Sequence, residues 1–306
     1  MREIMKQKDT STKIISLTRK IADKNAALVR RKNRNRKSNT RVIAITSGKG
    51  GVGKTNIVGN LGFALSQLGK KVLILDADLG LGNIDVLLGL APKYNLSHVI
   101  AEEKSISEII IKGPGNMNIL PASSGIQELT KLTKEQRIQI LTELDSLIDS
   151  IDILLIDTAA GISSNVMYFN VSAQEIMVVV TPDPTSITDA YALMKVLSIK
   201  YSERHFNLLV NSASSKQDAH EVFRQLNLVA DRFLDISIEY SGCVLFDENV
   251  TKGVRRQKIV SELYPDTRAS RCYASLAKKI CKSQPHHSPK GDTNFFWKDL
   301  IQNKFD

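Results

Sequence analysis

Cysteine is scarce in this sequence of 306 residues, which contains only Cys243, Cys272 and Cys281. Their irregular spacing excludes a disulfide framework and the paired C-x-x-C ligands of a zinc site. It also excludes the closely placed cysteines that hold an iron–sulfur cluster. We therefore expect reduced thiols in a cytosolic protein.

Long apolar runs are also missing. The N-terminal segment MREIMKQKDTSTKIISLTRK has no apolar stretch long enough for a secretory signal. No run of about 18 apolar residues occurs anywhere in the chain. The sequence thus predicts a cytoplasmic protein that does not span a membrane. Apolar residues at 42% and charged residues at 24% fit a domain with one large core.

Positive charge is concentrated at the N-terminus. Residues 1–41 hold 14 Lys or Arg and 3 Asp or Glu, whereas the remainder holds 28 and 29. A neutral body with a basic tail indicates an anionic partner for the tail, such as nucleic acid, membrane headgroups or an acidic protein face. The alternative is a solvated tail, because residues 30–41 include nothing apolar to anchor it.

Short β-branched runs alternate with longer periodic segments from Arg41 onward. The runs predict strands at 42–46, 72–76, 117–120, 153–157, 176–180 and 207–211, and their uniformly apolar character indicates burial on both faces. The periodic segments predict helices at 56–68, 134–149, 186–199 and 218–234. The fold class is therefore α/β, with a mostly parallel sheet covered by helices on both faces.

Composition breaks divide the chain into four segments. We expect a basic tail at 1–40 with a candidate helix around 13–30, a single α/β domain at 41–281 and a flexible linker at 282–294. Residues 295–306 predict an amphipathic helix that inserts into a membrane interface, with a helix docked on the domain as the alternative. The predicted membrane residues are Phe295, Phe296, Trp297, Leu300, Ile301 and Phe305.

A glycine-rich loop follows the first predicted strand. The sequence S-G-K-G-G-V-G-K-T satisfies the P-loop pattern G-x-x-x-x-G-K-[ST] between a strand and a helix. Its backbone N–H groups close around phosphates, while Lys54 reaches the β- and γ-phosphates and Thr55 ligates Mg²⁺. The alternative is a glycine-rich turn without a ligand. It would not explain why the strand-to-helix position, Lys54 and the hydroxyl of Thr55 all match the P-loop pattern. The predicted ATP-binding residues of this P-loop NTPase domain are Gly48, Lys49, Gly50, Gly51, Val52, Gly53, Lys54, Thr55 and Asn56.

Polar side chains follow later strands, where ligands bind in open α/β sheets. Asp76 and Asp78 follow the second strand, and Asp157 ends ILLID as the Walker B carboxylate of the Mg²⁺ site. Gly161 marks the expected second switch loop. Asn211 could pair with the edge of adenine or be only a turn residue. A strand-end aspartate can also be only a helix cap.

The additional lysine, Lys49, gives the variant K-G-G-x-G-K-T, which resembles the MinD/ParA/NifH class of deviant Walker A ATPases. In that class the first lysine reaches the partner's ATP, so the resemblance implies an ATP-dependent homodimer. The alternative for Lys49 is a solvated loop charge. The resemblance further implies that Asp76 helps hold hydrated Mg²⁺ and that Asp78 orients the attacking water. The implied catalytic residues are Lys49, Lys54 and Asp78, and the implied metal residues are Thr55, Asp76 and Asp157.

Three stretches resemble FlhG (FleN) proteins more specifically: residues 53–65 together with 76–90, residues 181–198, and residues 246–267. The resemblance implies a regulator of flagellar number that partners an FlhF-type GTPase and, in some bacteria, a flagellar transcription regulator or the C-ring. As a MinD-like switch, it would dimerise with ATP, associate reversibly with the inner face of the cytoplasmic membrane, and reset by slow hydrolysis to ADP and phosphate.

The N-terminal tail departs from the D-Q-A-x-x-L-R helix with which FlhG proteins activate FlhF. Here D-K-N-A-A-L-V-R retains Asp23 and Leu28, but has Lys24 and Asn25 and displaces the arginine to Arg30. A basic tail without a catalytic role is therefore the alternative.

Two other functions fit the same scaffold. One is a ParA-type partition ATPase that binds DNA non-specifically, with phosphate contacts from the tail. The aromatic C-terminal segment, which such a protein does not need, favours the membrane switch, so nucleic acid is not expected as a partner. The other is a metabolic ATP-dependent ligase, for which the sequence indicates no substrate pocket.

Overall fold

The computed structural model describes residues 40–122, 132–147 and 150–284. The basic tail, the linker and the predicted membrane helix lie wholly or largely outside these ranges, so the domain boundaries stay predictions. Within the described part, no helix combines the length and apolarity needed to cross a membrane.

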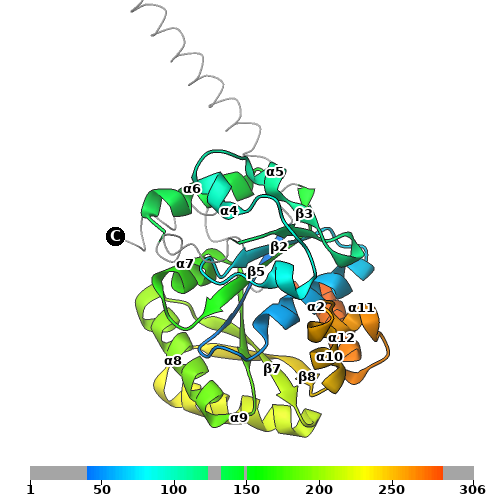
Figure 1. Cartoon of the computed structure of the whole chain (residues 1–306). Coiled ribbons are helices and arrows are strands. Elements are labelled where there is room, and N and C mark those ends of the chain that lie inside the picture. Colours follow the sequence, from blue (N-terminus) through cyan, green and yellow to red (C-terminus); the bar gives the residue numbers. More distant parts are fainter. Residues whose placement is uncertain (1–39, 123–131, 148–149, 285–306) are drawn as a thin grey trace, which may run out of the picture.

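A mixed sheet in the order β3-β4-β2-β5-β1-β6-β7-β8 forms the centre of the described structure (Figure 1). Every neighbouring pair is parallel except β3 and β4. The predicted α/β class with a mostly parallel sheet is confirmed, and all six predicted strands are present. The strands are β1 Arg41–Ser47, β2 Val72–Ala77, β3 Ile111–Lys112, β4 Asn118–Leu120, β5 Ile153–Ala160, β6 Glu175–Val180, β7 His205–Ala213 and β8 Ser237–Leu245.

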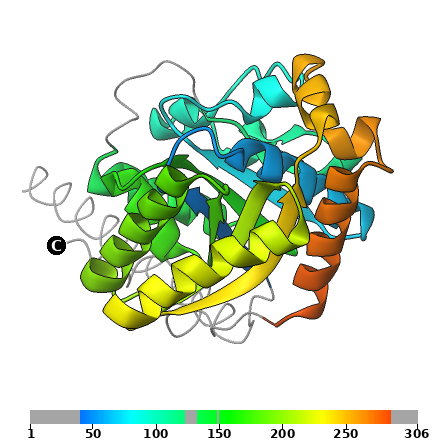
Figure 2. The same cartoon turned by 90° about the horizontal axis from the view of Figure 1, so that it is seen from below.

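Helices cover both faces of the sheet, as predicted (Figures 1 and 2). Those against one face are α2 Lys54–Gln67, α3 Ile84–Leu87, α10 Glu248–Arg255, α11 Val260–Leu263 and α12 Arg268–Lys282. Those against the other are α4 Leu96–Ile100, α5 Ile106–Ile109, α6 Lys134–Asp145, α7 Ser164–Ser172, α8 Pro184–Tyr201 and α9 Lys216–Phe233.

The pleat of the central strand explains why its apolar residues do not alternate with polar ones. Ile43 and Ile45 of β1 pack under α2 and α12, whereas Val42 and Ala44 pack on the opposite face. Since both faces are covered by helices, positions 42–45 are all apolar. Burying one valine or isoleucine side chain contributes about 1.5–3 kcal/mol to the free energy of folding.

Strand order places the predicted nucleotide residues together. β1 lies between β5 and β6, and β5 also pairs with β2. Because these strands are parallel, the loops that follow β1, β2 and β5 leave the same edge of the sheet. Asp76 and Asp157 occupy paired positions in β2 and β5.

Candidate nucleotide-binding site

The P-loop is held from two sides by elements distant in sequence. A Cβ on Gly48 would lie 2.1 Å from the backbone oxygen of Asp189 in α8. Gly53, which caps α2 with φ of +91°, would clash at 2.5 Å with Nδ2 of Asn211. Asn211 also donates from Nδ2 to the backbone oxygen of Val52 at 2.7 Å. Close approach therefore requires glycine at positions 48 and 53, and Asn211 braces the loop.

Lys54 is buried inside the loop, with 9% of its surface exposed. Its Nζ donates to Oγ of Ser47 at 2.8 Å, and that hydroxyl donates to the backbone oxygen of Lys49 at 2.6 Å. Burial lowers the pKa of Lys54, while the charges of Asp157 and Asp78 act in the opposite direction. The ammonium group thus lies beside a cluster of carboxyl groups whose charge partly offsets the effect of burial.

Asp76 and Asp157 form the buried centre of that cluster. Asp76 accepts backbone hydrogen bonds from Asp78 at 3.2 Å and Ile84 at 3.3 Å, yet burial and the neighbouring Asp157 hold its pKa well above the usual range. Burial raises the pKa of Asp157 to about 7, and the Thr55 hydroxyl and Lys54 limit the rise. Oδ1 of Asp157 is buried and has no hydrogen-bond partner among the described residues.

These oxygens fit a magnesium ion. Carboxylate and hydroxyl oxygens are the ligands that Mg²⁺ prefers, and an unpaired buried carboxylate oxygen is stabilised by a cation. The described residues include no group of three His, Cys, Asp or Glu that would form a metal cage by themselves. Mg²⁺ accepts this arrangement, because it usually keeps several waters and binds phosphate oxygens with one or two carboxylates.

Lys49 lies in a different environment from Lys54. Its side chain is 39% exposed, and Nζ contacts the carboxylate of Asp183 and the hydroxyl of Thr185 at the start of α8. Asp183 is also the N-cap of α8, accepting from the Thr185 N–H at 3.0 Å. Lys49 is therefore held on the outer rim of the loop by a partly exposed ion pair.

Sequence reasoning missed Ser47, Asp183 and Thr185. The Asp-Pro pair at 183–184 is a recognisable helix start, but nothing local indicates that it meets a lysine 134 residues earlier. The predicted Gly50, Gly51, Thr55 and Asn56 lie in the P-loop or the first turn of α2. The predicted membrane residues, 295–305, lie outside the described residues.

Comparisons with known proteins identify the family of this chain. The AAA domain family matches residues 40–209. The chain is 43% identical to the antiactivator FleN of Pseudomonas aeruginosa, over 86% of this chain and 94% of that protein. It is 32% identical to the flagellum site-determining protein YlxH of Helicobacter pylori, over 87% and 91%. MinD of Pyrococcus horikoshii, solved with Mg-ADP, matches with a TM-score of 0.66 and 25% identity over 79% and 96%.

The mostly parallel sheet, the two-lysine P-loop and the strand-end carboxylates define a MinD/ParA-type ATPase with a deviant Walker A motif. Such a protein binds a nucleotide with Mg²⁺ and hydrolyses ATP. Within this class, the chain belongs to the family of FleN (FlhG).

Proposed function

We propose that this ATPase is a nucleotide-dependent switch that regulates the number or placement of flagella. The names of its relatives, an antiactivator and a flagellum site-determining protein, support a role in flagellar regulation. The observation that carries the switch is the contrast between the two P-loop lysines: Lys54 is buried in the site, whereas Lys49 points to its outer rim. One lysine serves its own nucleotide, and the other lies where it can exchange its contact with Asp183 for one with a partner's nucleotide.

Within one subunit, the backbone N–H groups of residues 48–53 and the ammonium of Lys54 bind the β- and γ-phosphates of ATP. Thr55, Asp76 and Asp157 would hold Mg²⁺, which would supply positive charge to the phosphates. Asp78 orients the attacking water. Asn211 positions the loop, and its amide oxygen could accept a hydrogen bond from adenine.

Between subunits, Lys49 reaches the nucleotide of a second copy. Apolar side chains on the neighbouring loops support a protein interface there: Leu81, after β2, is 69% exposed, and Ile162, after β5, is 55% exposed. In the monomer Lys49 binds Asp183 instead, so dimerisation exchanges an internal ion pair for a contact across the interface.

The dimer then associates reversibly with the inner face of the cytoplasmic membrane. Support comes from the amphipathic pattern of residues 295–306. One such helix binds marginally, but two on one dimer bind with avidity, since the second binding event is intramolecular. The candidate partners, by family resemblance, are an FlhF-type GTPase and flagellar regulator or C-ring proteins.

Sedimentation of the full chain in ATP or ADP, with and without acidic phospholipid vesicles, tests this proposal. We expect dimers and vesicle binding with ATP only, loss of both in Lys54→Ala, and retention of both without hydrolysis in Asp78→Ala. A monomer that stays in solution with ATP would contradict the switch. Salt-sensitive binding to random duplex DNA without vesicle binding would instead support a partition ATPase.

A further inference from the structure

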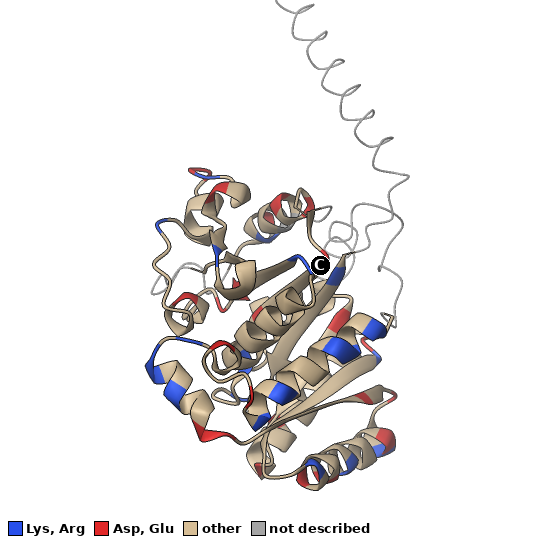
Figure 3. Cartoon of the chain, turned by 90° about the vertical axis from the view of Figure 1, so that its right-hand side faces the viewer, with Lys and Arg blue, Asp and Glu red and all other residues tan. Residues whose placement is uncertain are grey.

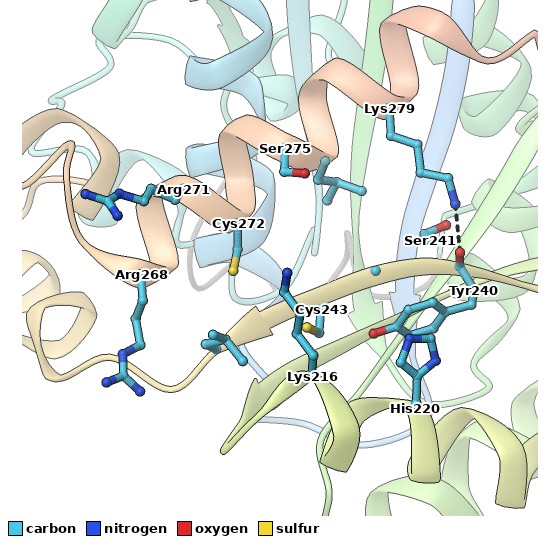
Figure 4. Close-up of a pocket in the computed structure, with 13 residues that line it drawn as sticks. Lys216, His220, Tyr240, Ser241, Cys243, Arg268, Arg271, Cys272, Ser275 and Lys279 are labelled. Atoms are coloured by element: carbon cyan, nitrogen blue, oxygen red, sulfur yellow. Dashed lines mark hydrogen bonds between the residues drawn. The ribbon is translucent and has the colours of Figure 1, made fainter.

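A cavity of about 490 Å³ lies away from the P-loop, between α9, β8 and α12 (Figure 4). It shares no residue with the predicted nucleotide site. Lys216 and His220 come from α9, Tyr240 and Cys243 from β8, and α12 forms the opposite wall. Cavities of this size hold ligands or partner side chains.

The walls of this groove are strongly basic. Lys216, His220, Arg268, Arg271 and Lys279 line it, and none of its 13 lining residues is acidic. Residues 42–306 carry 28 basic and 29 acidic residues, so this excess is local. Figure 3 shows Lys and Arg spaced along α12, the helix that forms one wall of the groove. A concentration of one sign in a cleft attracts the opposite charge.

Three of these cations are available to a ligand. No ion pair in the described part of the chain involves Lys216, Arg268 or Arg271. Lys279 instead contacts Glu239 at 3.3 Å and donates to the backbone oxygen of Tyr240 at 2.7 Å. The free positive charge is therefore at the end of the groove nearest Arg268.

The floor of the groove is an edge strand. β8 is the last strand of the sheet, so its outward backbone groups have no neighbouring strand among the described residues. Leu208 pairs with Tyr240 and Leu209 with Gly242, which leaves Ser241 as the extra residue of a bulge. A Cβ on Gly242 would meet nothing within 4 Å. The edge beyond the bulge is open to a short segment of another chain.

The length of the groove favours a peptide over a small anion. Arg268 and Lys279 lie eleven residues apart on α12, or about 16 Å at 1.5 Å per residue. An extended peptide covers that distance with about five residues. Its successive side chains would point alternately to the α9 wall and the α12 wall, and its backbone could pair with β8.

We propose that this groove binds an extended acidic segment of a partner protein. The carboxylates of the segment contact Lys216, Arg268 and Arg271, and its backbone adds to the free edge of β8 beyond Gly242. The groove is separate from the nucleotide residues, so the segment can bind without displacing ATP.

Fluorescence anisotropy of a labelled peptide of consecutive Glu residues tests the proposal on the full chain, because side chains at successive positions reach both walls. The matched peptide has Gln in place of Glu, and all titrations use one ionic strength. We expect the acidic peptide to bind, the Gln peptide to bind at least about fivefold more weakly, and Arg268→Gln/Arg271→Gln to weaken binding at least about fivefold. Lys216→Gln, on the opposite wall, should weaken it in the same direction.

Lys278→Gln is the control, because Lys278 lies on α12, is exposed and does not line the groove. It should leave peptide binding within about twofold, and all variants should bind nucleotide normally, which verifies their folding. Equal binding of the two peptides, no binding of the acidic one, or an equal loss in Lys278→Gln would overturn the proposal. Displacement by inorganic phosphate or duplex DNA at constant ionic strength would also overturn it, assigning the groove to another anion.

Discussion

Replacing Gly48 by alanine should destabilise the domain even without nucleotide. The new Cβ would lie 2.1 Å from the backbone oxygen and 2.2 Å from the backbone carbon of Asp189, so α8 or the P-loop must shift by about 1 Å. Overpacking of this kind costs about 1–3 kcal/mol, and a backbone obstacle places the cost near 3 kcal/mol because it cannot rotate away. For a domain of this size, that lowers the melting temperature by roughly 6–12 °C.

Gly50→Ala is the matched control in the same loop. A Cβ there meets nothing within 4 Å, and the φ of Gly50 lies outside the left-handed region. Its unfolding free energy should change by less than about 1 kcal/mol, with a small gain from the stiffer unfolded chain. Thermal unfolding followed by circular dichroism, without nucleotide, measures both variants. Equal melting temperatures for the two would refute the close approach of α8 to the loop.

Three further results are expected. The raised pKa of Asp157 means that its carboxyl binds a proton more tightly in the folded than in the unfolded chain. Without Mg²⁺ the unfolding free energy should therefore decline as the pH rises from about 4 to 7. Asp157→Asn should remove up to about 4 kcal/mol of that decline, as measured by urea titrations. Parallel pH profiles of stability for the wild type and the variant would contradict the burial argument. Asp183→Asn keeps an N-cap side chain on α8 but removes the negative charge that pairs with Lys49, so sedimentation should detect dimers at lower ATP concentration. The surface variant Glu221→Gln should match the wild type. Asn211→Ala leaves the Val52 carbonyl without its partner, so it should lower stability by about 1–3 kcal/mol and weaken calorimetric ADP binding; an unchanged affinity would show that the brace is not needed.

The central fold could be predicted because its signals are local. The strands around β1 are buried on both faces, so runs such as VIAIT and ILLID are recognisable without knowing their neighbours. The P-loop and the strand-end aspartates lie at positions that any parallel sheet brings to one edge. These residues required no long-range information.

The edge of the fold was harder to predict. β8 reads SIEYSGCVL, where Ser237, Glu239 and Ser241 interrupt the apolar residues and the bulge breaks the alternation.

α7 is buried along nearly its whole length, so it lacks the amphipathic period of a surface helix. The Lys49–Asp183 contact depends on the packing of α8 against the P-loop, which no local pattern records.

The position of β1 at the middle of the sheet also determines when the site can exist during synthesis. β1 leaves the ribosome first, but its partner β5 begins roughly 110 residues later, or ~5–20 s at ordinary elongation rates. Until β5 has been synthesised, the P-loop has no Asp157 beside Lys54. The amide of Asn211 becomes available still later. A nascent or truncated chain that stops before β7 should therefore be unable to retain nucleotide, and ATP can stabilise only the nearly complete domain.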